Sequence, residues 1–252
     1  MQLNNAGLSV DSEQLNRQMM PSAGLSVDSE RLNRKMVSSA GLPVIGITGI
    51  TGSGTSSVAE ILAERGGFVA HADKLAHETM VKGEAAYIEI VEAFGCGILS
   101  EKGEINRRAL GAKVFGSKTE LAKLERIIHP RVIERTKALV EKIAKTRTHS
   151  FAVIDAPLLI ESGMHTMCDS VWLITATNEM RTARIIARDE ITPEAAKRRL
   201  ASRISEEKLR RHALIIIENN GSEIALRSKV GVALKGMELN AHGWTGCKAV
   251  EL

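Results

Sequence analysis

The chain has 252 residues, of which 44% are hydrophobic and 25% charged, so it can bury a substantial core as globular proteins do. No apolar run approaches the roughly 18 residues of a membrane-spanning helix, and the N-terminus lacks the apolar segment of a signal peptide, so we expect a cytoplasmic protein outside membranes. The formal net charge is +4, but acids and bases are interleaved and only 3% of residues are aromatic. This balance argues against a nucleic-acid surface and favours small anionic ligands.

The first part of the chain, residues 1–42, contains an internal repeat. Residues 6–13 recur as residues 23–30, and each copy is typical of a short helix capped near Asp11 or Asp28. Two units of this length cannot form the core of a repeat protein. Two interpretations stay open: a duplicated docking arm or tail, and an element through which the chain binds itself or a partner.

From residue 43 onward, strand patterns alternate with helical ones. The predicted strands are residues 44–48, 68–71, 151–155, 171–175 and 214–217. Helical periodicity fills the segments between them, including a long stretch from residue 74 to residue 149. Alternation of this kind indicates βαβ units, so we expect an α/β fold with a five-stranded parallel sheet flanked by helices.

A glycine-rich segment follows the first predicted strand. Residues 49–56 read Gly-Ile-Thr-Gly-Ser-Gly-Thr-Ser, which has the spacing of a phosphate-binding P-loop. Glycines let the backbone amides turn toward phosphate oxygens, and the helix that follows adds its partly positive N-terminus. The alternative is a tight turn that binds nothing. We expect nucleotide binding by Gly49, Gly52, Ser53, Gly54, Thr55, Ser56 and Ser57, with the Ser56 hydroxyl on magnesium.

The loop departs from its motif at one position, because Thr55 stands where the motif has a lysine. That lysine reaches the β- and γ-phosphates of the nucleotide. A hydrogen bond to a charged group contributes about 1.5–3 kcal/mol, so its loss predicts a transfer slower by about 10- to 100-fold unless another cation substitutes.

Two carboxylates follow predicted strands. Asp73, in the sequence His71-Ala72-Asp73, can accept the proton of an attacking hydroxyl, and the alternative is a cap on a helix that starts at Lys74. Asp155 ends the third predicted strand, which is where P-loop proteins hold magnesium.

Basic and helix-ending residues complete the pattern. Arg184 and Arg188 lie four residues apart, so they share one face of a predicted helix. Thr192-Pro193 predicts the start of another helix, with the threonine as its cap. His129-Pro130 predicts a helix break, because a residue before proline disfavours the helical region.

Taken in order, these motifs are similar to those of the dephospho-CoA kinase family over residues 44–230. The resemblance rests on the P-loop, the segment 71–73, Phe94-Gly95, residues 103–107, His129-Pro130, the segment 155–161 and residues 217–222. It implies a nucleoside-monophosphate-kinase-like fold and ATP, Mg²⁺ and dephospho-CoA as ligands. The roles it implies are a catalytic base at Asp73, phosphate contacts from a lid at Arg184 and Arg188, an adenine contact at Asn219, metal binding at Asp155, and substrate binding at Arg107, His129, Pro157 and Leu158.

The resemblance also implies a division of the chain into parts. The nucleotide-binding core would comprise residues 43–73 and 150–235, with a lid at about 181–211, a helical substrate lobe at 74–149 and a tail at 236–252. The chain departs from the family's usual residues at Thr55, His71, Arg203 and Leu214. One interpretation of these departures is that Arg203 supplies the charge missing at Thr55.

We therefore expect ATP-dependent phosphorylation of the ribose 3′-hydroxyl of dephospho-CoA. Two alternatives stay open: a kinase-like protein that binds nucleotide or CoA without catalysis, and a related kinase with another substrate.

Overall fold

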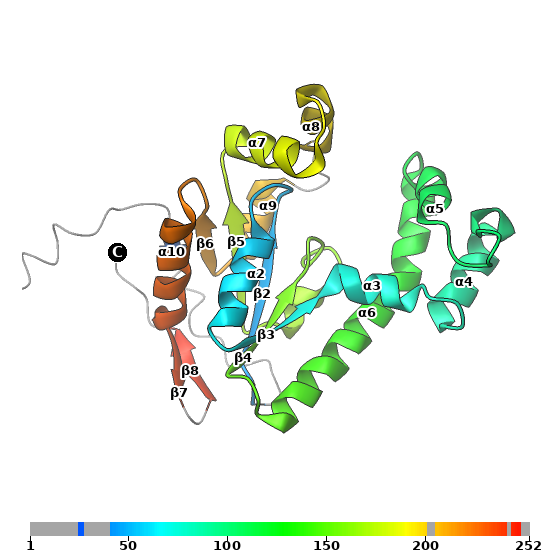
Figure 1. Ribbon diagram of the computed structural model, residues 1–252. Coiled ribbons are helices and arrows are strands. Elements are labelled where there is room, and N and C mark those ends of the chain that lie inside the picture. Colours follow the sequence, from blue (N-terminus) through cyan, green and yellow to red (C-terminus); the bar gives the residue numbers. More distant parts are fainter. Residues whose placement is uncertain (1–24, 28–40, 201–204, 241–242, 248–252) are drawn as a thin grey trace, which may run out of the picture.

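The computed structural model describes residues 25–27, 41–200, 205–240 and 243–247 (Figure 1). The helices expected near Asp11 and Asp28 and the compensating role considered for Arg203 lie outside the described residues.

Five parallel strands form the centre of the molecule, as the sequence predicted. They lie in the order β6-β5-β2-β4-β3, so the first of them in the chain, β2, is the middle strand. Each differs from its predicted range by at most one residue at either end. Their bounds are β2 (Val44–Gly49), β3 (Gly67–His71), β4 (Phe151–Asp155), β5 (Ser170–Thr175) and β6 (Ile215–Glu218).

A sixth, antiparallel strand comes from the N-terminal repeat. The three residues of β1 (Leu25–Val27) pair with β6 in the register Leu25↔Ile217 to Val27↔Ile215. The second copy of the repeat thus joins the sheet at its β6 edge, although the sequence separated this region from the core.

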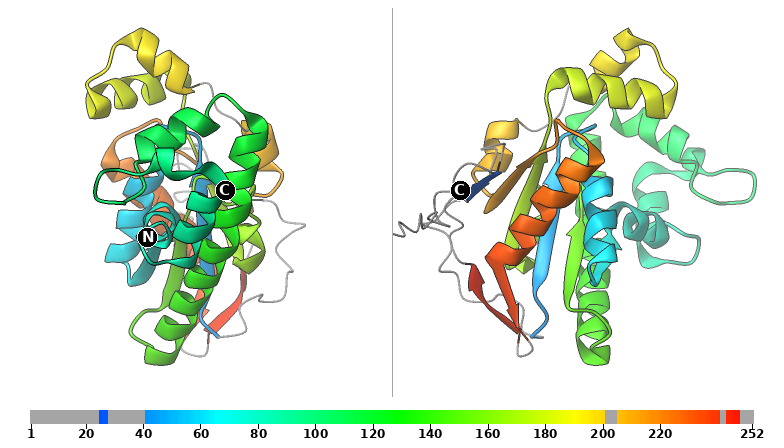
Figure 2. Two further views of the ribbon diagram at one scale, coloured as in Figure 1. Left: turned by 90° about the vertical axis from the view of Figure 1, so that its right-hand side faces the viewer. Right: turned by 60° about the vertical axis from the view of Figure 1, so that its left-hand side comes forward.

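Helices cover both faces of the sheet (Figures 1 and 2). One face packs against α2 (Thr55–Glu64) and α10 (Glu223–Gly236), and the other packs against α3 (Ala72–Thr79), α6 (Lys118–Thr146) and α9 (Glu206–Arg210). Successive residues of β4 alternate between the two cores, because side chains of a strand point to opposite faces in turn. Trp172 of β5 is fully buried on the α2 side.

A third apolar cluster lies away from the sheet. It joins α4 (Ala85–Phe94), the short 3-10 turn Cys96–Ile98 and α5 (Arg107–Val114) to the first half of α6. Figure 1 shows these helices at the far end of α6 from the sheet. Residues 74–149 are therefore mostly helical, and their role as a substrate lobe stays a prediction.

The helix break predicted at His129-Pro130 is wrong. Helix α6 runs through Pro130 without ending, although proline removes one backbone hydrogen bond and costs about 3 kcal/mol inside a helix. Packing on both sides of the proline offsets this cost. Val132 and Val140 are buried with the sheet, while Leu121 and Leu124 pack on the third cluster.

Two helices project beyond the carboxyl ends of the strands (Figures 1 and 2). They are α7 (Asn178–Asp189) and α8 (Pro193–Leu200). Helix α8 begins as the sequence predicted, since the Ala195 amide donates to Thr192 Oγ1 at 3.3 Å. At the opposite end, β7 (Met237–Asn240) and β8 (Gly243–Cys247) form a two-stranded antiparallel sheet in the segment expected as a tail. Within the described ranges, no helix combines the length and the apolar composition needed to cross a membrane.

Gly46 in the middle of β2 provides a test of this packing. A Cβ added there would lie 2.6 Å from Cys168 Sγ and 2.7 Å from Leu159 Cδ2, so Gly46→Ala should lower the free energy of unfolding by about 1–3 kcal/mol. Gly116→Ala is the control, because its Cβ would meet nothing within 4 Å. Chemical denaturation of both variants measures the difference, and equal stability would contradict the packing.

Candidate active site

The segment between β2 and α2 forms a loop in which the Gly52 and Gly54 amides have no hydrogen-bond partner among the described residues, while the Ser53 amide donates to the Ile50 carbonyl at 2.9 Å. Gly52 and Gly54 have φ of +84° and +95°, which glycine adopts without strain. Gly54 precedes α2 as its N-cap and offers no side chain to the first amides of the helix. A helix start with unclaimed amides attracts anions, because both the N–H groups and the helix dipole favour negative charge. The predicted phosphate loop therefore has the backbone shape that its motif requires.

Two side chains hold this loop from the β6 and α7 sides. Asn219 Nδ2 donates to the Ser53 carbonyl at 2.9 Å. Arg184 Nη1 lies 3.3 Å from both the Gly52 and Ser53 carbonyls, and its Nη2 donates to the Asn219 carbonyl at 2.8 Å. A Cβ on Gly54 would overlap with Asn219 Nδ2. Asn219 and Arg184 thus fix the carbonyl side of the loop.

Arg181 also contacts the loop, a role that was not predicted from the sequence. Its side chain is only 5% exposed, its Nε donates to the Thr51 carbonyl at 2.9 Å, and its Nη1 donates to Asn178 Oδ1 at 3.0 Å. Burial lowers the pKa of the Arg181 guanidinium from its ordinary value. The spacing of Arg181, Arg184 and Arg188 on one helical face was the signal that could have identified it.

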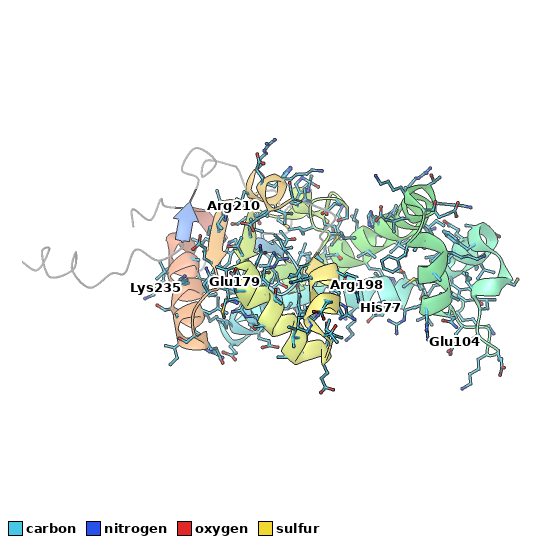
Figure 3. The ribbon with its side chains drawn as sticks, turned by 90° about the horizontal axis from the view of Figure 1, so that it is seen from above. His77, Glu104, Glu179, Arg198, Arg210 and Lys235 are labelled. Atoms are coloured by element: carbon cyan, nitrogen blue, oxygen red, sulfur yellow. The ribbon has the colours of Figure 1, made fainter. Side chains whose placement is uncertain are left out.

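Arg188 is not joined to the loop in this structure. Its Nε and Nη2 donate to the Asp189 carboxylate at 2.8 and 3.0 Å, and Arg199 pairs with the same carboxylate. Figure 3 looks down on α7 and α8, where Glu179 and Arg198 mark the two helices.

Asp155 and His71 lie side by side at the carboxyl ends of β4 and β3. Their Cα atoms are register partners, and His71 Nδ1 donates to Asp155 Oδ2 at 3.0 Å. Burial raises the pKa of the Asp155 carboxyl, while the His71 hydrogen bond lowers it in part and the charge of Asp73 raises it further. His71 therefore supports the ionised form of a half-buried acid, a role that the sequence did not suggest.

Asp73 lies in the first turn of α3 and is exposed to solvent. The helix begins at Ala72 with His71 as its N-cap residue, so the alternative of Asp73 as a cap before Lys74 is wrong. Because its charge acts on Asp155, Asp73 belongs to the same end of the sheet.

The residues present fit a magnesium ion that is also held by phosphate oxygens. No cluster of three or more His, Cys, Asp or Glu side chains suited to a metal occurs within the described ranges. Magnesium in nucleotide enzymes needs only one or two carboxylates together with phosphates and waters. Asp155 and the exposed Ser56 hydroxyl in the first turn of α2 are the groups that suit it.

A mostly apolar cavity of about 230 Å³ lies beside Asp73. His129, Pro157 and Leu158, three of the predicted substrate residues, line it together with Asp73. The other side chains around it include Leu121, Leu124, Ile128, Val132 and Met164. The structure thus brings together residues from α3, α6 and the segment after β4 that are far apart in the sequence.

Arg107 lies outside this cavity, at the start of α5. Its Nη1 is 3.1 Å from His77 Nε2, and His77 follows Asp73 by one turn of α3. Figure 3 shows His77 on α3 and Glu104 farther out, toward the end of the molecule that carries α4 and α5. Arg107 is therefore connected to the Asp73 side of α3 through one histidine.

A second, more polar cavity of about 240 Å³ lies on the other side of the loop, toward α10. Gly54, Ser57, Arg184 and Asn219 line it, with Gly221 from the turn after β6. The loop thus separates two cavities, and Asn219, predicted to border adenine, lines the one away from Asp73.

Replacing His71 by alanine tests the coupling with Asp155. Because the donor stabilises the ionised carboxylate, His71→Ala should raise the pKa of Asp155 further. Carboxyl carbon NMR titration measures this pKa. His149→Ala is the control, because His149 contacts Phe68 and should leave the Asp155 pKa unchanged when it is replaced. An unchanged Asp155 pKa in His71→Ala would contradict the hydrogen bond.

Comparison with known proteins identifies the family of this chain. The sequence model of the family described as dephospho-CoA kinase matches residues 43–224. The dephospho-CoA kinase of Moorella thermoacetica is 37% identical over 199 residues, covering 79% of this chain and 93% of the relative. That of Fusobacterium nucleatum is 40% identical over 187 residues, covering 74% and 94%.

Two solved structures share the fold. A Thermus thermophilus protein has a TM-score of 0.63 at 31% identity and covers 77% of this chain and 95% of its own. The dephospho-CoA kinase from Campylobacter jejuni has a TM-score of 0.55 at 29% identity and covers 76% and 95%. On the family match, on these identities and on the coverage of both chains, this protein belongs to the dephospho-CoA kinase family.

Proposed function

We propose that the chain transfers the γ-phosphoryl group of magnesium-ATP to the ribose 3′-hydroxyl of dephospho-CoA, which gives CoA and ADP. The observation that carries this proposal is the meeting of two unlike sites at one end of the sheet. The phosphate loop follows β2, while Asp73 follows β3, and the apolar cavity is lined by residues after β3 and β4. A phosphoryl donor and a hydroxyl acceptor can therefore approach each other above the middle strand.

The acceptor would occupy the cavity lined by His129, Pro157 and Leu158. Apolar walls suit the uncharged parts of dephospho-CoA, while Arg107, which lies against His77 one turn of α3 from Asp73, can receive one of its phosphates. This use of the cavity is also what gives residues 74–149 their proposed role as a substrate lobe.

The donor would bind across the loop, with its phosphates on the amides of Gly52, Gly54 and Thr55. Its adenine would occupy the cavity beside Asn219 and Arg184, on the side of the loop away from Asp73. Magnesium bound by Ser56 and Asp155 would neutralise charge on the phosphates. Arg188 would exchange Asp189 for the transferring phosphoryl group as a lid of about residues 181–211 closes.

In the transfer, the 3′-oxygen bonds to the γ-phosphorus as the bond to ADP breaks. Asp73 accepts the hydroxyl proton, because it is an exposed carboxylate beside the acceptor cavity. The hydrogen bond from His71 favours the ionised form of Asp155 against the effect of its burial. The association expected of the N-terminal repeat stays a prediction, with β1 as its described part.

A second candidate function follows from Thr55, whose half-buried side chain carries no charge. A kinase-like protein that binds nucleotide and CoA without transfer would have the same two cavities. Incubating the natural chain and a Thr55→Lys variant with magnesium-ATP and dephospho-CoA separates the two functions. CoA from the natural chain supports the transfer, whereas nucleotide binding without CoA from either protein supports the binding role.

Asp73→Asn tests the acceptor side. Without a proton acceptor, CoA formation should fall by about 10²- to 10⁴-fold while ATP affinity changes little. Steady-state rates and calorimetric titration with ATP measure the two effects. Glu134→Gln, which alters an exposed carboxylate on α6, is the control and should leave both unchanged. A normal rate in Asp73→Asn would remove Asp73 from the mechanism.

A further inference from the structure

Arg181 is a buried cation that forms no ion pair with any residue the structure describes. Among the described residues, its guanidinium donates to the Thr51 carbonyl and to Asn178 Oδ1, while its buried Nη2 has no hydrogen-bond partner there. Within the described part of the chain no carboxylate forms an ion pair with it, and Glu206 of α9 acts on it only through its charge. A buried charge is unfavourable unless something compensates it. An anionic ligand near Arg181 would provide that compensation.

The position of Arg181 determines which way a peptide group of the loop faces. Three consecutive carbonyls of the loop, those of Thr51, Gly52 and Ser53, face two arginines of α7. In a trans peptide the N–H points opposite to the C=O, so a guanidinium on the Thr51 carbonyl turns the Gly52 amide toward the other side of the loop. That amide has no hydrogen-bond partner among the residues that the structure describes. On that side, away from the two arginines, the Gly52 amide can donate to a phosphate oxygen.

The loop needs a cation that Thr55 cannot supply. Arg184 is already engaged by three carbonyls, and Arg188 is paired with Asp189. Among the described residues, the Nη2 of Arg181 has no acceptor and no carboxylate forms an ion pair with this guanidinium, which lies against the carbonyl side of the loop. Its backbone also packs on Gly52, where a Cβ would lie 2.9 Å from the Arg181 carbonyl, so its distance from the loop is fixed.

We propose that Arg181 takes the place of the missing loop lysine as a positioning residue. From behind the loop it holds the Gly52 amide on the β- and γ-phosphates and supplies the positive charge that the loop lacks at Thr55. This inference rests on the proposed function for its catalytic consequence, but its effect on nucleotide affinity does not. Because the interaction is with phosphate charge, it strengthens with the number of phosphates and disappears for a ligand with one.

Affinity measurements without dephospho-CoA test this inference directly. Calorimetric titrations of magnesium-ATP, ADP and AMP would compare the natural chain with Arg181→Gln, Arg181→Lys, Thr55→Lys and the double variant Thr55→Lys/Arg181→Gln. Arg126→Gln, on the exposed side of α6, controls for loss of one positive charge. We expect Arg181→Gln to weaken ATP binding by about 10- to 100-fold and AMP binding by less than about 3-fold. Arg181→Lys should keep most of the ATP affinity.

The double variant distinguishes an arginine whose charge acts on the phosphates from one that only stabilises the shape of the loop. Thr55→Lys should restore ATP affinity by at least about tenfold in the Arg181→Gln background but by less than about 3-fold in the natural one, because the two cations serve one site. Equal losses for ATP and AMP, or no restoration by the lysine, would overturn the inference. If Arg181→Gln does not fold, Thr55→Lys alone decides, and a gain of about 100-fold in ATP affinity overturns it.

The same variants separate this inference from the proposed function. If the natural chain forms CoA but Arg181→Gln loses the same affinity for ATP, ADP and AMP, the proposed function stands and the role of Arg181 is overturned. If the nucleotide affinities change as expected but no CoA is formed, the role of Arg181 stands and the proposed function is overturned.

Discussion

The hydrogen bonds that α7 makes to the carbonyls of the phosphate loop set the geometry on which the rest of the site depends. Arg181 and Arg184 donate to the carbonyls of residues 51–53 on one side of the loop, so the Gly52 and Gly54 amides point to the other. The same contacts join the helix that begins the proposed lid to the middle strand of the sheet. Arg184 also reaches the Asn219 carbonyl, which ties the β6 end to the loop. Loop, lid base and nucleotide cavity therefore form one unit.

Much of the fold could be predicted from local patterns. The parallel strands are buried runs bounded by turn residues, and the loop glycines required by φ are visible in the sequence. Pro130 could not be placed correctly, because its cost is offset by packing at both ends of α6, which joins segments distant in sequence. Strand β1 was also missed, since three residues pairing at a sheet edge leave little signal beside a repeat that reads as helical.

The candidate site was predictable as a set of residues but not as a set of contacts. Asp73 and residues 157–158 follow the adjoining strands β3 and β4, and they meet His129 of α6 at one cavity. The spacing of Arg181 and Arg184 places both on one face of α7, but the burial of Arg181 and the hydrogen bonds of Arg181 and His71 cannot be read from the sequence. Arg188 pairs with its own neighbour Asp189, a contact that a motif cannot specify.

The central claim is that the shape of the loop, without a lysine, binds the phosphates of ATP. Titration of magnesium-ATP into the natural chain and into Gly54→Ala tests it most directly, because the added Cβ would displace Asn219 from the loop. Gly83→Ala is the matched control, since Gly83 also has a positive φ, of +98°, but a Cβ there meets nothing within 4 Å. The account predicts binding of one ATP by the natural chain and Gly83→Ala, and a large loss in Gly54→Ala. Absence of binding by the natural chain, or equal binding by all three, would contradict it.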